Sequence, residues 1–209
     1  MDALPPLTSD RFDLLRIVGQ LDEHSPTAAA LLDRSLAAGV SLRIADDAAF
    51  DADGGEGLVG RYDPATKQVW IRRSVLQDDV AQAVQTLAHE LVHAVDRTGG
   101  ANDALMARLD ARYRSEGWND DAVRGAQVRY HSGLVRESRA YVVQAQVRRE
   151  LGLEAKSSFH RAIADAPTEL GAYQAAWEDL ARTYRDDEPI AFRDVPVVFM
   201  PGSTPDDPA

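Results

Sequence analysis

The spacing of apolar residues along the chain predicts a helix, then a small sheet, then a helical C-terminal half. Residues 26–38 form an Ala/Leu-rich run that opens with a Ser-Pro start signal and stops at a glycine, which predicts a helix. Apolar and polar positions alternate over 40–44, as in a half-buried strand, and an acidic, glycine-rich loop is expected over 46–57. Residues 1–10 are expected to be a loose entry to the fold.

Two strand-like runs, 58–62 and 68–72, flank an Asp-Pro turn and predict a β-hairpin with Trp70 in the core. From Asp78 to Arg97 apolar residues recur every three or four positions until two glycines end the run, which predicts a long helix with a buried stripe. The positions of this stripe are Val80, Val84, Leu87, Leu91 and Val95. Further helices are expected at roughly 103–114, 120–130, 132–151 and 158–184.

These elements predict one α+β domain over residues 1–200, followed by a disordered acidic tail over 201–209. The net charge of −11 disfavours nucleic acid and anionic membranes as partners, because both attract clustered positive charge. The chain shows no secretion signal and no apolar run long enough to cross a membrane. A cytoplasmic location is therefore expected, with delivery by a specialised secretion system left open.

The predicted long helix contains the sequence His89-Glu90-Leu91-Val92-His93, an H-E-x-x-H motif. At about 100° per residue, the two histidines lie on one helix face and point at one ion. The chain has no cysteine, which leaves His, Asp and Glu to bind a metal, and this set suits Zn²⁺. Glu90 is then the expected general base for a metal-activated water. The alternative is an amphipathic helix with two solvated histidines and a surface glutamate.

A catalytic zinc site needs a third protein ligand. A histidine six residues after the motif is ruled out, since position 99 is a glycine. The downstream candidates are His131, Glu137, Glu150, Glu154 and His160. Glu137 is preferred because it lies early in a long predicted helix and the small Ala140 follows one turn later on the same face, which allows a close helix approach.

Three further side chains have weaker claims to the site. Asp96, one turn after the motif, would accept a ring N–H from a ligand histidine, or only ends the helix. Tyr141 would orient a ligand or donate to a developing oxyanion, or is a core tyrosine. His131 would polarise the substrate or replace Glu137 as ligand, or is a solvated loop histidine.

The H-E-x-x-H motif followed by Glu137-Ser-Arg-Ala140 resembles the gluzincin metallopeptidases, with their downstream E-x-x-A. Locally, H-E-L-V-H-A-V-D and E-S-R-A are similar to the mitochondrial ATP-synthase-subunit processing peptidase family, which reads H-E-L-[IV]-H-A-x-D and E-x-R-A. The strand-turn-strand ahead of the motif also resembles compact bacterial zincins, including effector peptidases delivered into host cells. The resemblance implies a zincin-like domain, with a small twisted sheet packed on the motif helix. The characteristic cysteines of the mitochondrial processing peptidase family are missing here, so the compartment and substrate of that family are not transferred to this chain.

The residues together predict a zinc-dependent endopeptidase, a hydrolase that cleaves a peptide or protein substrate. His89, His93 and Glu137 are the expected ligands and Glu90 the expected base. The strand 68–72 is a candidate edge strand for pairing with an extended peptide. The alternatives are a catalytically silent zinc-binding or metal-free interaction domain, and a secreted effector or toxin protease with one target. The sequence leaves the substrate, a gating partner and the oligomeric state open.

Overall fold

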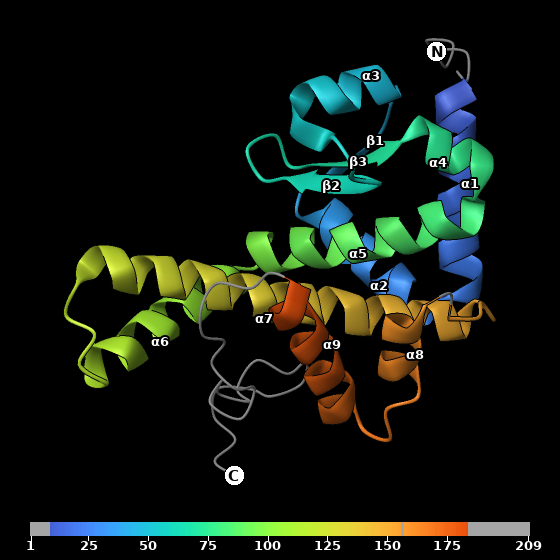
Figure 1. The fold of residues 1–209 in the computed structure, drawn as a ribbon. Coiled ribbons are helices and arrows are strands. Elements are labelled where there is room, and N and C mark those ends of the chain that lie inside the picture. The colour runs from blue at the N-terminus through green and yellow to red at the C-terminus, as the bar shows by residue number, and fades with distance from the viewer. Residues whose placement is uncertain (1–8, 156, 184–209) are drawn as a thin grey trace. The chain divides into compact units, whose positions relative to one another are not determined.

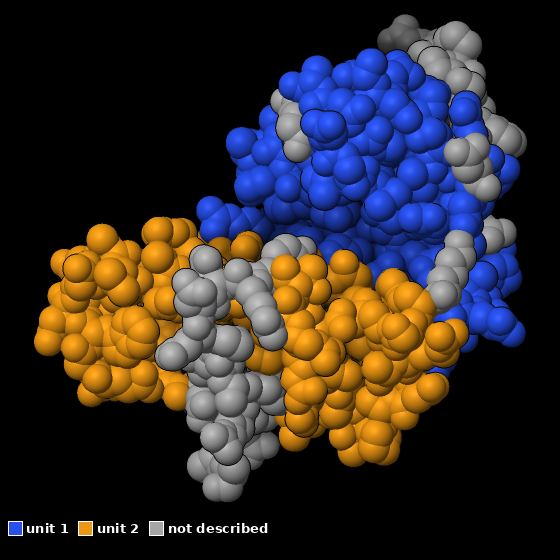
Figure 2. All heavy atoms as spheres, in the orientation of Figure 1, with its two compact units in different colours: residues 1–99, 143–155 blue, residues 100–142, 156–209 orange. Residues whose placement is uncertain are grey.

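The computed structural model describes residues 9–155 and 157–183, and the chain divides into two compact units (Figures 1 and 2). Unit 1 is Met1–Gly99 with Val143–Ala155, and unit 2 is Gly100–Val142 with Lys156–Ala209. Most of the described residues are helical, and three strands form one sheet, which confirms the α+β class.

Some sequence predictions fall at or beyond the limits of the described ranges. The tail expected over 201–209 lies outside them, and so do residues 1–8 of the expected loose entry. The single domain expected over 1–200 stays a prediction. Within the described ranges, no helix is long and apolar enough to cross a membrane.

Unit 1 contains a mixed sheet with the strand order β1-β3-β2. Strand β1 (Ser41–Ala45) pairs in parallel with β3 (Gln68–Arg72), and β2 (Gly60–Asp63) pairs with β3 in the antiparallel sense, which confirms the predicted hairpin. The prediction that strand 68–72 is an edge strand was wrong, because β1 occupies its second side. The outer strands of the described sheet are β1 and β2.

The two faces of β3 differ in their surroundings. Val69 and Ile71 are buried, whereas Trp70 points to the opposite face and is half-buried. Arg43 and Arg61 are the direct neighbours of Trp70 on the flanking strands, and their guanidinium carbons lie 4.6 and 5.2 Å from the centre of a Trp70 ring. Trp70 therefore contacts two cations across the sheet and is not a core residue as expected.

The segment expected as a loop over 46–57 is mostly helical. It forms α3 (Asp47–Phe50) and a single π-helical turn, η1 (Asp51–Gly55). Phe50 is fully buried, and the Asp51 carboxylate forms an ion pair with Arg72 of β3. One buried aromatic ring and this ion pair stabilise a helical turn. The acidic, glycine-rich composition of the segment did not predict this turn.

Four further helices belong wholly to unit 1. They are α1 (Ser9–His24), α2 (Pro26–Ala37), α4 (Arg73–Asp78) and α5 (Val80–Thr98). The helix predicted over 26–38 is confirmed as α2, and the Ser25 hydroxyl accepts a hydrogen bond from the Ala28 amide as its N-cap. Helix α1 was not predicted, and it begins inside the expected loose entry.

The motif helix α5 is the centre of unit 1. Its predicted start at Asp78 is shifted, because α4 ends there and the Asp79 side chain caps α5 by accepting from the Gln82 amide at 3.0 Å. Leu87 and Leu91 are fully buried, as the predicted stripe requires. Because α5 packs against α1, α2, α4, β2 and β3, most of its surface is buried.

Unit 2 is helical and shares one helix with unit 1. Its described helices are α6 (Ala101–Ser115), the first part of α7 (Asp121–Glu150), α8 (Ser158–Ala164) and α9 (Glu169–Thr183). The two helices expected over 120–130 and 132–151 are one, because the buried positions Val128, His131 and Leu134 continue at helical spacing through the expected break. The single helix expected over 158–184 is interrupted around Pro167, and this break separates α8 from α9.

Candidate metal centre

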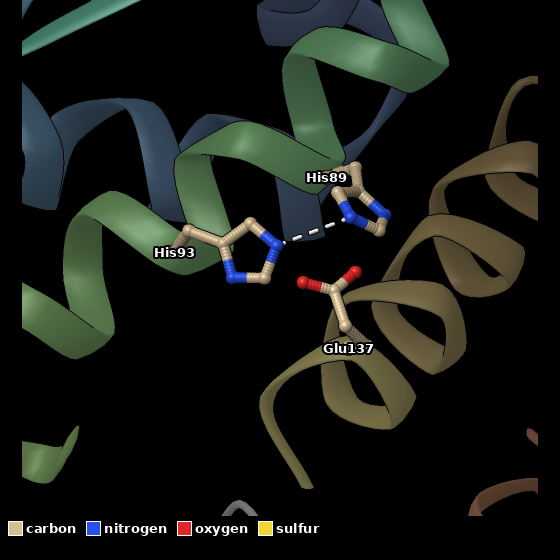
Figure 3. A group of neighbouring side chains, drawn as sticks. All are labelled: His89, His93 and Glu137. Atoms are coloured by element: carbon tan, nitrogen blue, oxygen red, sulfur yellow. Dashed lines mark hydrogen bonds between the residues drawn. The ribbon is translucent and has the colours of Figure 1, made fainter. Parts of the chain in front are cut away.

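His89 and His93 lie in the middle of α5 and on one of its faces (Figure 3). Their Nε2 atoms are 3.1 Å apart, and their rings meet edge to face with centroids 4.9 Å apart. Both side chains are half-buried, although almost all of their neighbours on the helix are buried. The predicted convergence of the two imidazoles is therefore present in the structure.

Glu137 of α7 completes the group. Its carboxylate points toward the two rings in Figure 3, and one ligand atom from each of the three residues lies within 4.8 Å of the other two. Among residues 9–155 and 157–183, no other set of His, Asp and Glu side chains converges in this way. The structure thus brings together the three residues that the sequence assigned as ligands.

The spacing of these atoms fits a zinc ion. Zinc–ligand distances of about 2.0–2.1 Å in a tetrahedral site put two ligand atoms about 3.3–3.4 Å apart. The 3.1 Å between the Nε2 atoms is close to this value, and the 4.8 Å limit leaves the Glu137 carboxylate at most about 1.5 Å to move. A hydrogen bond between the two imidazoles fits 3.1 Å as well, if one ring donates to the other.

Glu90 and Asp96 are the other two residues of α5 assigned to the site. Glu90 lies between the two histidines in sequence and is 9% exposed, and Asp96 is 4% exposed. A carboxylate this far removed from water needs polar or charged neighbours, and both side chains have them. The roles of Glu90 as base and of Asp96 as a partner of a ligand histidine stay predictions.

Glu150, one of the candidate third ligands, has a different role. Its carboxylate accepts hydrogen bonds from the Ser25 hydroxyl at 2.5 Å, the Thr27 hydroxyl at 2.6 Å and the Thr27 amide at 3.1 Å. Gln146 donates a fourth at 2.7 Å. Burial raises the pKa of Glu150, but these hydrogen bonds outweigh it and hold the pKa below its ordinary value. Glu150 thus binds the N-terminus of α2 to α7.

His131 is fully buried inside unit 2 and is not a solvated loop residue. Its Nδ1 atom lies 2.6 Å from the Tyr113 hydroxyl, and its ring stacks on Trp177 with centroids 6.2 Å apart. Burial lowers the pKa of His131 to about 4, so the ring is neutral at physiological pH. His131 does not belong to the group of converging ligands.

The remaining candidates are Tyr141 and His160 of unit 2 and Glu154 of unit 1. The Tyr141 ring packs edge to face against Phe159 at 4.9 Å and against His160 at 6.0 Å, in an aromatic cluster. His160 in turn lies at the start of α8, where its Nδ1 atom is 2.6 Å from the Ser157 hydroxyl. Glu154 is exposed. The alternative of Tyr141 as a packing residue therefore agrees with its surroundings.

Sequence reasoning missed a polar pair near the group, Gln85 and Arg148. Gln85 lies one turn before His89 on α5 and is buried, and Arg148 donates a hydrogen bond to it from α7. The sequence offers no signal for this pair, because Gln85 lies outside the apolar stripe of α5 and on the side of the helix that carries the histidines.

Comparison of the chain with family models, with curated proteins and with solved structures found no match. The resemblance to gluzincins stays a prediction from the sequence. The geometry of the three side chains is independent of that similarity.

Proposed function

We propose that this chain is a zinc-dependent endopeptidase of the zincin type, in which His89, His93 and Glu137 hold the metal. The observation that supports this most is the approach of their three ligand atoms to within 4.8 Å of one another. Two imidazoles and one carboxylate are the ligand set of several zinc peptidases, and they leave a fourth position open for water. A bound zinc would lower the pKa of that water toward about 7 and polarise the scissile carbonyl.

In this proposal Glu90 acts first as general base and then as general acid. It would accept a proton from the attacking water and later deliver it to the leaving amine. Its position next to His89 in sequence and its low exposure fit a base that works away from bulk solvent. A purely structural site has no need of such a base and usually takes four protein ligands.

The experiment that tests the proposal measures the metal content of the purified full chain after dialysis without chelator. Wild type is compared with Glu137→Gln, with Glu90→Gln and with Glu154→Gln, a matched control at an exposed glutamate. About one zinc per chain is expected in wild type, Glu90→Gln and the control, and loss of zinc in Glu137→Gln. Cleavage of a fluorescently labelled unfolded protein is then expected from wild type and the control, and not from Glu90→Gln.

Each departure from this pattern has a distinct meaning. Zinc retained by Glu137→Gln would show that the third ligand is another residue. Zinc bound by wild type without any cleavage would favour the catalytically silent zinc-binding domain. A wild-type chain that binds no zinc, even after reconstitution, would favour a metal-free interaction domain.

A further inference from the structure

A buried polar pair joins α5 to the C-terminal part of α7 within unit 1. Arg148 donates through Nη1 to Oε1 of Gln85, and the amide of Gln85 donates to the Ala81 carbonyl at 2.8 Å. Both side chains are about 4% exposed. Burial lowers the pKa of Arg148, which reflects the loss of hydration around the guanidinium, while Asp79 opposes that shift.

This arrangement is costly as a stabilising device alone. A buried guanidinium loses its hydration, and a neutral amide oxygen compensates for only part of that loss. Apolar residues of similar size in such positions often stabilise a protein as well or better. Buried polar pairs are known, in contrast, to specify one register between packed helices.

The pair lies on the faces that carry the candidate ligands. On α5, Gln85 precedes His89 by one turn and His93 by two, so the three side chains share a face. On α7, Arg148 follows Glu137 by 11 residues, which is about three turns and leaves the two side chains about 20° apart around the helix. One face of each helix therefore carries both a ligand and a member of the pair.

We infer that Gln85 and Arg148 are positioning residues, whose hydrogen bond fixes the register of α7 against α5 and thereby the place of the Glu137 carboxylate. The inference rests on the proposed metal site. A slip of α7 by one turn would move Glu137 about 5.4 Å along the helix axis. That exceeds the 4.8 Å within which the three ligand atoms now lie, so the ligand set would be broken.

The test measures zinc affinity by competition with a chromophoric chelator, using the full-length folded chain. The variants are Arg148→Met and Gln85→Met, which put an unbranched apolar side chain in place of each member of the pair, and their double variant. Arg149→Met is the matched control, since Arg149 is the exposed neighbour of Arg148 on the same helix. Gln85→Glu is the conservative variant, because a carboxylate still accepts from Arg148.

Arg148→Met and Gln85→Met are each expected to weaken zinc binding by about 10- to 100-fold, the usual effect of losing a group that orients a ligand. The double variant is expected to bind no more weakly than either single variant, because both remove the same hydrogen bond. Gln85→Glu and Arg149→Met are expected to stay within about threefold of wild type. The visible spectrum of the cobalt-loaded chain is expected to change in the two methionine variants and not in the control.

A merely stabilising pair would behave differently. It would lower the unfolding temperature of the metal-free variants and leave the zinc affinity and the cobalt spectrum of the folded chain unchanged, and that result overturns the inference while the proposed function stands. If Arg148→Met fails to fold, Gln85→Met and Gln85→Glu decide the question by the same two readouts. A wild-type chain that binds no zinc overturns the proposed function and this inference with it.

Discussion

Replacing His131 by phenylalanine is expected to remove part of the pH dependence of folding stability. The buried ring lies among Tyr113, Tyr130 and Trp177, and the folded state binds a proton there poorly. Burial is the main cause of the lowered pKa, Arg112 adds to it, and a hydrogen bond to the Gln127 backbone opposes it. Phenylalanine keeps an aromatic ring in this cluster and removes the titrating group.

The magnitude follows from the two pKa values of His131. The ordinary value of 6.5 applies to the unfolded chain, and the folded value is about 4. Because the folded value is the lower one, the unfolded chain binds the proton more tightly, so stability falls as the pH drops through 6.5 and the loss levels off below about 4. Linkage gives a loss of about 2 kcal/mol from this one residue between pH 7 and pH 5.

The assay is urea unfolding in the presence of chelator, at several pH values from 7.5 to 4.5. The free energy of unfolding of wild type is expected to fall by about 2 kcal/mol more than that of His131→Phe over the pH 7 to 5 range. The lost contact with Tyr113 lowers the stability of the variant equally at every pH, so it leaves this difference unchanged. His24→Gln, at a side chain that is 57% exposed, serves as control and is expected to follow wild type. Parallel profiles for wild type and His131→Phe would refute the reasoning.

Further predictions concern stability and metal binding. Gly60→Ala is expected to cost about 1–3 kcal/mol in urea unfolding, because a Cβ atom there would lie 2.5 Å from Thr86 Cγ2. Gly133→Ala, inside α7 with nothing within 4 Å of the added carbon, is expected to gain about 0.5–1 kcal/mol; a loss would show that the site is packed. Glu150→Gln is expected to cost about 1–3 kcal/mol by the same assay, because its amide cannot accept all the hydrogen bonds from Ser25 and Thr27. Zinc at about 100 times its Kd is expected to stabilise wild type by about 2.7 kcal/mol and Glu137→Gln much less, as read from thermal unfolding.

Local signals in the sequence predicted the elements that build the candidate site. The Ser25 cap, the turn between the two hairpin strands and the apolar stripe of α5 each depend on residues close together in the chain. The same periodicity put His89 and His93 on one face and favoured Glu137 over the other candidates. Helix geometry could predict their convergence, because the two histidines are one turn apart on α5 and Glu137 lies on one long helix.

The predictions that failed depend on contacts between distant segments. Strand β3 is central only because β1, more than twenty residues earlier, pairs with it in parallel, and no local pattern reports such a pairing. The segment around Phe50 is helical because the carboxylates of Asp47 and Asp51 form ion pairs with Arg72 and because the Phe50 ring is buried. The polar pair of Gln85 and Arg148 was likewise hidden, since a hydrogen bond between two helices has no signature in either helix alone.

The placement of the three tryptophans has a consequence for spectroscopy. Trp70 is the tryptophan of unit 1 and contacts Arg43 and Arg61, whereas Trp118 and Trp177 belong to unit 2. Trp177 is buried and Trp118 packs on Tyr113. The tryptophan fluorescence of the wild-type chain therefore combines signals from both units. A Trp70→Phe chain would report the unfolding of unit 2 alone. The difference between the two emission signals would follow the sheet of unit 1 without any added label.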